Sequence, residues 1–226
     1  GRTPLRRLTR YEFENTLEDV LSIKLKQPYR DAITGRIDRS TIESIVPSDI
    51  PGESGFDNDA LRSEKLKPPL NDLASAVHYA LSEFSKDPIA MKTVLGRADI
   101  PTDVSEDEIQ LIISRFLLRA YRGQREHLPE YTQTYYNLYL KHVQTSKDIN
   151  VSLRHLFEII LVSPEFLYRF EQTKNQDTPY PVTGVELATR LSYFLWSSTP
   201  DEELLRLGQN GRLLKNDVLK SQISRM

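Results

Sequence analysis

The sequence contains no cysteine among its 226 residues. Without thiols, the chain cannot form a disulfide framework, a thiolate-ligated zinc or iron–sulfur site, or a covalently attached haem. Its longest apolar run falls far short of the ~20 residues that cross a bilayer, so no membrane span is expected. Strand signals are also scarce, because no alternating β-branched run is bounded by turn pairs. These absences leave an α-helical globular protein as the expectation.

The chain also lacks an excess of basic residues. It carries 30 Lys and Arg against 32 Asp and Glu, which gives a formal net charge of -2. Proteins that bind nucleic acid usually concentrate positive charge far above their acids, so nucleic acid is not an expected partner. Charged residues form 27% and hydrophobic residues 38% of the chain, which is typical of a folded globular protein.

Helix starts are the clearest local signal in the sequence. In a capping box, a Ser or Thr side chain and a Glu three residues later each satisfy a backbone N–H at the helix N-terminus. Complete boxes with a flanking hydrophobic pair begin at Thr9, Ser105 and Thr183. Boxes without that pair begin at Ser40 and Thr199. We therefore expect five helices that start at these positions.

Apolar residues recur at three- and four-residue spacing through much of the remaining chain. This spacing predicts a helix whose apolar face runs from Leu70 to Phe84 and a short helix that starts at Asp87-Pro88 and ends at Gly96. It also predicts a tyrosine-containing helix that begins near Pro129, and helices capped by Asn150 and Ser163. Together with the capping boxes, the pattern predicts an all-α fold, a bundle of about eight to ten helices.

Two stretches interrupt this periodicity. Residues 24–69 are rich in Pro, Gly and Asp, and a loop of that length inside a compact domain is usually functional or bound to a neighbour. Residues 173–181 form a polar stretch with two prolines. We therefore expect an N-terminal helix plus irregular segment (1–69), a central helical bundle (70–172) and the start of a further helical domain (173–226). The last helical pattern has no terminator, so we expect the chain to be a fragment.

The stretch LSYFLWSSTPDEELL at residues 191–205 places serines, a threonine and acids beside the only tryptophan. Helical spacing predicts that Trp196 closes one helix, in which Leu191, Phe194 and Leu195 pack inward, and that Thr199 caps the next. The alternative is a catalytic serine, but no His or Lys base lies nearby in the sequence. Helix punctuation is the preferred interpretation.

Other residues with chemical potential are better explained as structure. The four histidines form no metal-binding motif, so no metal is expected, although His155 and Glu158 lie one helical turn apart. The arginines of residues 2–10 precede four acids, which predicts a solvated, self-compensated surface. The tyrosines at 131, 135, 136 and 139 are expected in a core or interface, with sugar stacking as the alternative.

Three blocks of the sequence resemble a known group of domains. They are RLTRYEFENTLEDVL with PSDIPGESGFDN, FLLRAYRG with ILVSPEFLYRFE, and GVELATRLSYFLWSSTPDEELLRLGQNGRL. In this order they are similar to planctomycete domains of unknown function that occur together in large exported proteins, often beside a cytochrome c domain. The resemblance implies a periplasmic or cell-envelope location. It also implies that any haem c lies elsewhere in the full-length protein, with no cofactor in this chain.

The resemblance carries no established catalytic residue, so the catalytic residues are unknown. The GFDN run inside the irregular segment has no helical role that we can assign, and it is either a plug that buries its phenylalanine or part of a binding loop. The candidate binding residues are Gly55, Phe56, Asp57, Asn58, Arg190, Tyr193 and Trp196.

Two functions of different classes fit this sequence. The first is a helical scaffold or interaction module of a larger exported, cytochrome c-linked protein. Its partners would be the remainder of its own polypeptide and an envelope polymer or redox protein. The alternative is part of an oxidoreductase or polysaccharide-acting enzyme whose site is completed by the missing C-terminal region. A pocket lined by the candidate binding residues would favour the enzyme.

Overall fold

The computed structural model describes residues 6–25, 41–50, 69–100, 104–171 and 181–226. Within these ranges the chain forms eleven α-helices, nine of them seven residues or longer, one 3-10 helix and two short strands. The predicted all-α fold is therefore confirmed. The irregular segment predicted for residues 24–69 lies mostly outside the described ranges, and its described part contains the short helix α2 (Thr41–Ile45).

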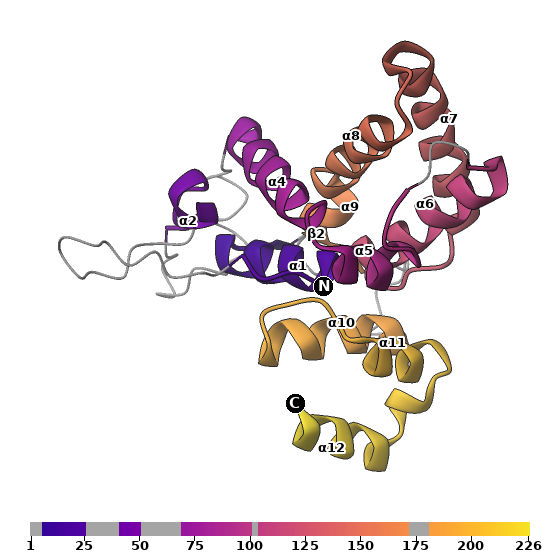
Figure 1. The fold of residues 1–226 in the computed structure, drawn as a ribbon. Coiled ribbons are helices and arrows are strands. Elements are labelled where there is room, and N and C mark those ends of the chain that lie inside the picture. Colours follow the sequence, from indigo (N-terminus) through magenta and orange to yellow (C-terminus); the bar gives the residue numbers. More distant parts are fainter. Residues whose placement is uncertain (1–5, 26–40, 51–68, 101–103, 172–180) are drawn as a thin grey trace, which may run out of the picture.

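The first part of the chain, residues 6–171, is called the body here. Its helix α1 lies between α4 and α5 on one side and the C-terminal helices on the other (Figure 1). Strands β1 and β2 pair in antiparallel fashion, with Arg6 opposite Arg169. The elements are β1 (Arg6–Arg7), α1 (Arg10–Leu21), α2, α4 (Leu70–Phe84), α5 (Pro88–Leu95), α6 (Glu106–Ala120), α7 (Leu128–Ser146), α8 (Ile149–Leu161), α9 (Pro164–Leu167) and β2 (Tyr168–Arg169).

Residues 181–226 form a second layer below α1 in Figure 1, and we call them the C-terminal unit. It contains α10 (Gly184–Leu195), α11 (Glu202–Gln209), the 3-10 helix η1 (Arg212–Leu214) and α12 (Asn216–Arg225). None of the helices in the described ranges is both long and apolar enough to cross a bilayer.

The body and the C-terminal unit have separate hydrophobic cores. The larger core draws on residues of both 1–69 and 70–172, from Leu8 in the first range to Leu167 in the second. The smaller core contains Ala188, Leu204, Leu207 and Leu213. Tyr193 is the exception, because it belongs to the C-terminal unit but is buried in the larger core. This side chain is therefore an anchor between the two layers.

The three complete capping boxes form as predicted. The side chains of Thr9, Ser105 and Thr183 accept hydrogen bonds from the backbone N–H of the glutamate three residues later, and that glutamate bonds back to the cap N–H. Each such cap stabilises a helix by about 1 kcal/mol. The cap predicted at Ser163, at the start of α9, also forms.

Two predicted caps were wrong by two residues. Helix α8 is capped by Asp148 instead of Asn150, because the Asp148 carboxylate accepts from the N–H of Val151. Helix α11 is capped by Asp201 instead of Thr199, because its carboxylate accepts from the N–H of Leu204. In both places the cap is an aspartate directly before the first helical residue, and its negative charge also suits the helix dipole.

The predicted inward face of α10 was also wrong. Phe194 is 83% exposed and Leu195 is 41% exposed, whereas Leu191 packs partly against the smaller core. The reason is a close crossing of α10 and α11 at two glycines: a Cβ added to Gly184 would lie 2.2 Å from the carbonyl oxygen of Gly208. Backbones that approach this closely place the small residues of α10 inside and turn Phe194 outward.

Candidate functional site

Helix α1 carries acidic side chains into the interior. Glu12, Glu14 and Glu18 are only 5%, 1% and 7% exposed. Buried carboxylates are costly without partners, and Glu18 accepts a 2.6 Å hydrogen bond from the N–H of Leu25. Arg7 is also buried and pairs with Asp49 at 2.5 Å. The prediction of a solvated, self-compensated N-terminal segment was therefore wrong, because its charges bond to groups distant in the sequence.

A buried hydrogen-bond network joins the C-terminal unit to the body at Tyr193. The hydroxyl oxygen of Tyr193 accepts a 3.0 Å hydrogen bond from Nε of Arg122 and lies 2.9 Å from the hydroxyl of Thr16. The two Nη atoms of Arg122 donate to the carbonyl oxygens of Glu165 and Phe166. The guanidinium is thus held by neutral acceptors in the interior, and it orients the Tyr193 hydroxyl.

Two arginines also contact the Tyr193 ring. The guanidinium carbons of Arg122 and Arg169 lie 5.4 and 5.0 Å from the ring centroid, which is cation–π distance. Burial lowers the pKa of Arg169, and the nearby Glu12 carboxylate, 3.6 Å from Nη2, opposes that shift. Tyr193 therefore contacts a hydroxyl of α1 and guanidinium groups of β2 and of the segment after α6, so it serves to hold these elements together.

Further polar contacts join α1 to the loop between α10 and α11. Asn15 donates to the carbonyl oxygen of Ser197 at 3.2 Å, and the Ser198 hydroxyl donates to Asp19 at 2.5 Å. Ser197 adopts a left-handed backbone conformation with φ 54°. At the C-terminal end of α11, Gln209 donates to the carbonyl oxygen of Gly123 at 3.3 Å. The junction between the two layers thus contains polar bonds as well as apolar contacts, such as that of the Leu205 side chain with Gly123.

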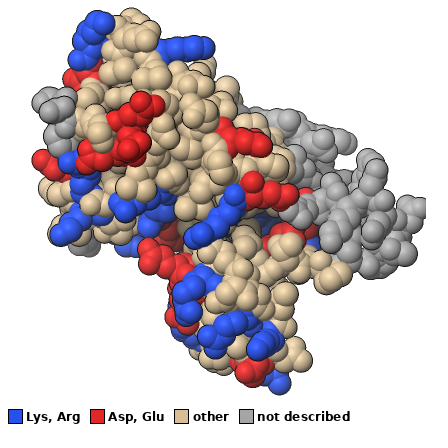
Figure 2. Space-filling view, turned by 90° about the vertical axis from the view of Figure 1, so that its right-hand side faces the viewer, with Lys and Arg blue, Asp and Glu red and all other residues tan. Residues whose placement is uncertain are grey.

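A cleft of about 1210 Å³ lies between these contacts. Its walls come from α1, α5 and α6 of the body and from α11 and the loop before it. The molecule narrows between the body and the C-terminal unit, and side chains of both charges meet at this waist in the space-filling view (Figure 2). Aromatic and neutral polar lining residues include Tyr11, Asn15, Thr93, Trp196 and Gln209. A concave site with convergent polar groups is typical of ligand-binding sites.

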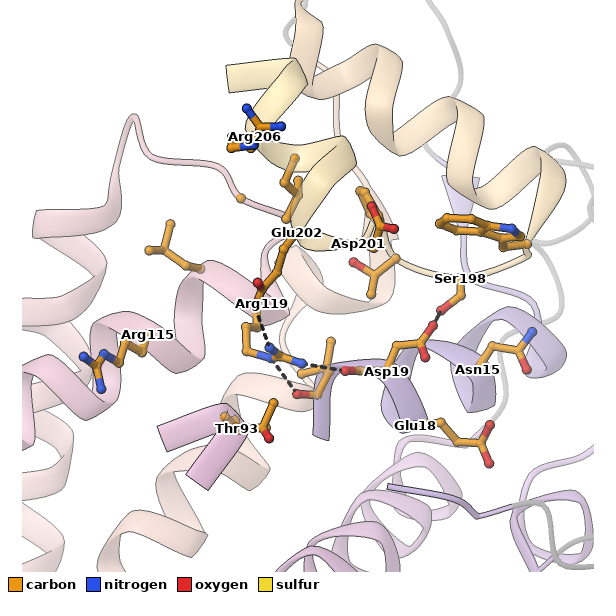
Figure 3. A pocket seen from close by; sticks show the side chains of 18 of the residues that line it. Asn15, Glu18, Asp19, Thr93, Arg115, Arg119, Ser198, Asp201, Glu202 and Arg206 are labelled. Carbon is orange, nitrogen blue, oxygen red and sulfur yellow. Dashed lines mark hydrogen bonds and ion pairs between the residues drawn. The ribbon is translucent and has the colours of Figure 1, made fainter. Parts of the chain in front are cut away.

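Arg119 of α6 lies at the centre of the cleft, between Asp19 of α1 and Glu202 of α11 (Figure 3). Its Nε donates to the carbonyl oxygen of Val20 at 3.0 Å, and its Nη2 donates to the carbonyl oxygen of Asp19 and to the hydroxyl of Ser22. Burial lowers the pKa of Arg119, while the charges of Glu202 and Asp19 act in the opposite direction. The guanidinium is therefore fixed in place and partly desolvated.

The structure describes three of the predicted binding residues, and these three lie in different surroundings. Trp196 lines the cleft, and its Nε1 donates to the carbonyl oxygen of Met226 at 3.2 Å. Tyr193 is buried beneath the junction, whereas Arg190 points elsewhere and pairs with Glu171 through bonds of 2.7 and 2.5 Å. The run Gly55, Phe56, Asp57 and Asn58 lies outside the described residues.

Sequence reasoning missed most of the cleft. Asn15, Asp19 and Arg119 lie on helices whose apolar faces were identified, yet only the fold brings their polar faces opposite α11. The sequence did contain one signal for this site, which is the high density of acids on α1. A helix that packs against neighbours on most sides buries charged groups only when those groups have partners. No spacing rule links residues about a hundred positions apart.

The tyrosine helix α7 faces the interior, as expected. Tyr135, Tyr136 and Tyr139 are at most 9% exposed, and the hydroxyls of Tyr121 and Tyr135 lie 2.7 Å apart. Burial raises the pKa of Tyr121. Because these rings are covered, they do not provide the pair of coplanar exposed rings that sugar stacking on this helix requires.

The histidines make surface contacts. Nδ1 of His78 lies 2.8 Å from Glu158, and the rings of His142 and His155 stack with centroids 4.4 Å apart. Across the described ranges, no group of three or more His, Asp or Glu has a geometry suited to a metal ion. These side chains connect α4, α7 and α8 at the surface of the body.

Two family models match the chain. Residues 108–171 match PSD5, a protein family of unknown function (DUF1595), and residues 182–226 match PSD4, a second such family (DUF1592). No curated protein matches the chain, and no solved structure matches it either. The first matched segment runs from α6 to β2, and the second is the C-terminal unit. The Arg122–Tyr193 hydrogen bond joins the two matched segments, and both contribute walls to the cleft.

Proposed function

We propose that this chain is a helical scaffold or interaction module of a larger exported, cytochrome c-linked protein in the periplasm or cell envelope. The observation that carries this proposal is the buried contact of Tyr193 with Arg122 and Thr16, which uses interior polar groups to fix one layer on the other. A network of this kind holds parts in one arrangement. Support for the setting comes from the sequence resemblance described above.

In this proposal the partner is the remainder of the same polypeptide, and any haem c is carried there. The exposed Phe194 and Leu195 of α10 fit such a role, because large apolar side chains at a surface often mark contact sites. An envelope polymer or a redox protein would be a further partner of the assembled protein.

Size-exclusion chromatography of the chain mixed with the separately produced remainder of its polypeptide tests this function. We expect the two to elute together at micromolar concentrations, and we expect Phe194→Asp to weaken the complex. Leu214→Asp is the matched control, because Leu214 is another exposed apolar residue of the C-terminal unit. Separate elution of the unmodified pieces would contradict the proposal.

The second candidate is part of an oxidoreductase or polysaccharide-acting enzyme whose site is completed by further polypeptide. The cleft favours it, because a concave site with a desolvated arginine is a common setting for catalysis. Mass spectrometry of polysaccharides incubated with the full-length protein tests this function. New chain ends or oxidised sugar units would support the enzyme, and unchanged substrates would count against it.

A further inference from the structure

The cleft is lined by four acidic and four basic side chains, but three of the four acids are already engaged in hydrogen bonds within the protein. Asp19 accepts from Ser198, and Asp201 both caps α11 and pairs with Arg225 at 2.6 Å. Glu18 accepts from the N–H of Leu25. These carboxylates stabilise the walls of the cleft, so their charge is largely committed to the protein itself.

Arg119 lacks an equally close carboxylate. Its three hydrogen bonds go to two backbone carbonyls and one hydroxyl, all of them neutral acceptors. The nearest carboxylate oxygen, on Glu202, is 3.8 Å from Nη1, and the Glu202 side chain is 93% exposed. That distance is too long for a hydrogen bond. A solvent-exposed glutamate at this distance screens the charge only weakly, so Nη1 remains available to an anion that enters the cleft.

Three more arginines line the cleft from separate segments. They are Arg115 on α6, Arg125 after α6 and Arg206 on α11. Among the residues that the structure describes, none of the three forms an ion pair with a carboxylate. Arg115 is positioned by a 3.3 Å bond to the carbonyl oxygen of Leu95 and by close contact with Gly96. The cleft therefore carries several cations that no carboxylate of the described ranges neutralises.

The size of the cleft and the residues that line it narrow the class of anion that the cleft can bind. A volume of about 1210 Å³ exceeds the ~1,000 Å³ upper range of pockets for single small molecules, so an extended ligand fits better. Tyr11 and Trp196 supply aromatic surface, and Asn15, Thr93 and Gln209 add neutral amide and hydroxyl groups, each of which also donates one hydrogen bond within the protein. Rings beside neutral amides and hydroxyls suit sugar units, while guanidinium groups bind carboxylates in a bidentate manner.

We propose that the cleft between the body and the C-terminal unit binds an acidic oligosaccharide, with Arg119 as the central carboxylate-binding residue and Arg115 and Arg206 on its flanks. This inference goes beyond the scaffold function and does not depend on it. A scaffold without such a site would retain the Tyr193 network but would show no selectivity for sugar acids.

The single tryptophan of the chain provides a direct readout, because Trp196 lines the cleft. The 226-residue chain is titrated with galacturonate oligomers, with their fully methyl-esterified counterparts and with polyglutamate. We expect a saturable change in Trp196 emission with the acidic oligomers alone, and the affinity should fall as salt is added. Equal binding of the neutral ester, preference for polyglutamate, or no binding by any probe would each overturn the proposal.

Amino-acid substitutions distinguish specific binding in the cleft from non-specific electrostatic attraction of the ligand to the protein. Arg119→Gln should weaken binding by about tenfold, the loss expected for one charge-assisted contact. If that variant is unstable, Arg115→Gln with Arg206→Gln tests the same site, because both side chains are exposed and their replacement should leave folding intact. Arg212→Gln is the control, since Arg212 is exposed on η1 and does not line the cleft. Equal losses in the control and the cleft variants would also overturn the proposal.

Discussion

The hydroxyl of Ser198 donates a 2.5 Å hydrogen bond to the carboxylate of Asp19, although the two residues are 179 positions apart. The bond joins the loop between α10 and α11 to α1 at the edge of the cleft. The Ser198–Asp19 bond replaces contacts between the carboxylate and water. It therefore orients the loop, and it determines which polar groups are exposed in the cleft.

The Ser198–Asp19 bond should contribute measurably to stability. Ser198→Ala removes the donor and leaves the Asp19 carboxylate with fewer partners, so we expect a loss of about 1–2 kcal/mol in the free energy of unfolding. Urea unfolding followed by Trp196 fluorescence measures this loss. Ser75→Ala, at an exposed position of α4, is the control and should change stability by less than about 0.5 kcal/mol. Equal effects of the two substitutions would contradict the role assigned to Ser198.

Tyr193→Phe should destabilise the chain more than its small size change suggests. The substitution keeps the ring between Arg122 and Arg169 but removes the hydroxyl that accepts from Arg122, which leaves a buried donor unsatisfied. We expect a loss of about 1–3 kcal/mol, measured by denaturant unfolding. Tyr131→Phe, on the partly exposed side of α7, should be nearly neutral. A neutral Tyr193→Phe would show that the network does not hold the layers together.

Gly208→Ala should destabilise the chain, although replacing a helical glycine with alanine usually stabilises a protein. In most helices alanine is more stable than glycine by about 1 kcal/mol. Here the added Cβ would lie 2.6 Å from the carbonyl oxygen of Gly184, so α10 and α11 would have to separate. We expect a net loss of about 1–3 kcal/mol and a lower melting temperature by circular dichroism. A stabilised variant would be incompatible with the close helix crossing.

The Arg190–Glu171 pair predicts a pH dependence. Hydrogen bonding to Arg190 lowers the pKa of Glu171 below its usual value of 4.5. A carboxylate whose pKa is lowered by folding stabilises the protein above its unfolded pKa, and this contribution disappears as pH falls through the folded value. Since both side chains are partly exposed, the effect at pH 7 should be under about 1 kcal/mol. The stability difference between the wild type and Arg190→Gln, measured by urea unfolding, should shrink as the pH falls below 4.5 and should vanish at a pH low enough to protonate Glu171 in the folded chain. A difference that persists there would rule out this linkage.

The helical architecture could be predicted from the sequence, because the signals that mark helices are local. A capping box needs only four residues, and the boxes at Thr9, Ser105 and Thr183 formed where they were predicted. The buried face of α10 could not be predicted from the sequence, because it depends on the contact between Gly184 and Gly208 in two different helices. Periodicity reports which residues share a face, but it does not report how closely the neighbouring helix approaches.

The cleft was even less accessible from the sequence. Trp196 was identified because it is unusual in composition, whereas Arg119 resembles any helical arginine until α1 and α11 are placed beside it. The buried acids of α1 were interpreted as a solvated surface, because local charge balance was assumed to be sufficient. Their partners lie elsewhere in the chain, as the Arg169–Glu12 pair illustrates.

The central place of α1 restricts how this protein can be divided. Thr16 and Asp19 contact the C-terminal unit, while Leu17 and Leu21 are fully buried in the core of the body. A fragment cut to the two family-matched segments, residues 108–226, would lose this shared helix and with it the contact of the Tyr193 hydroxyl with Thr16. The boundaries of the sequence families are therefore not the boundaries of an autonomous folding unit, and residues 6–25 belong in any fragment intended to fold.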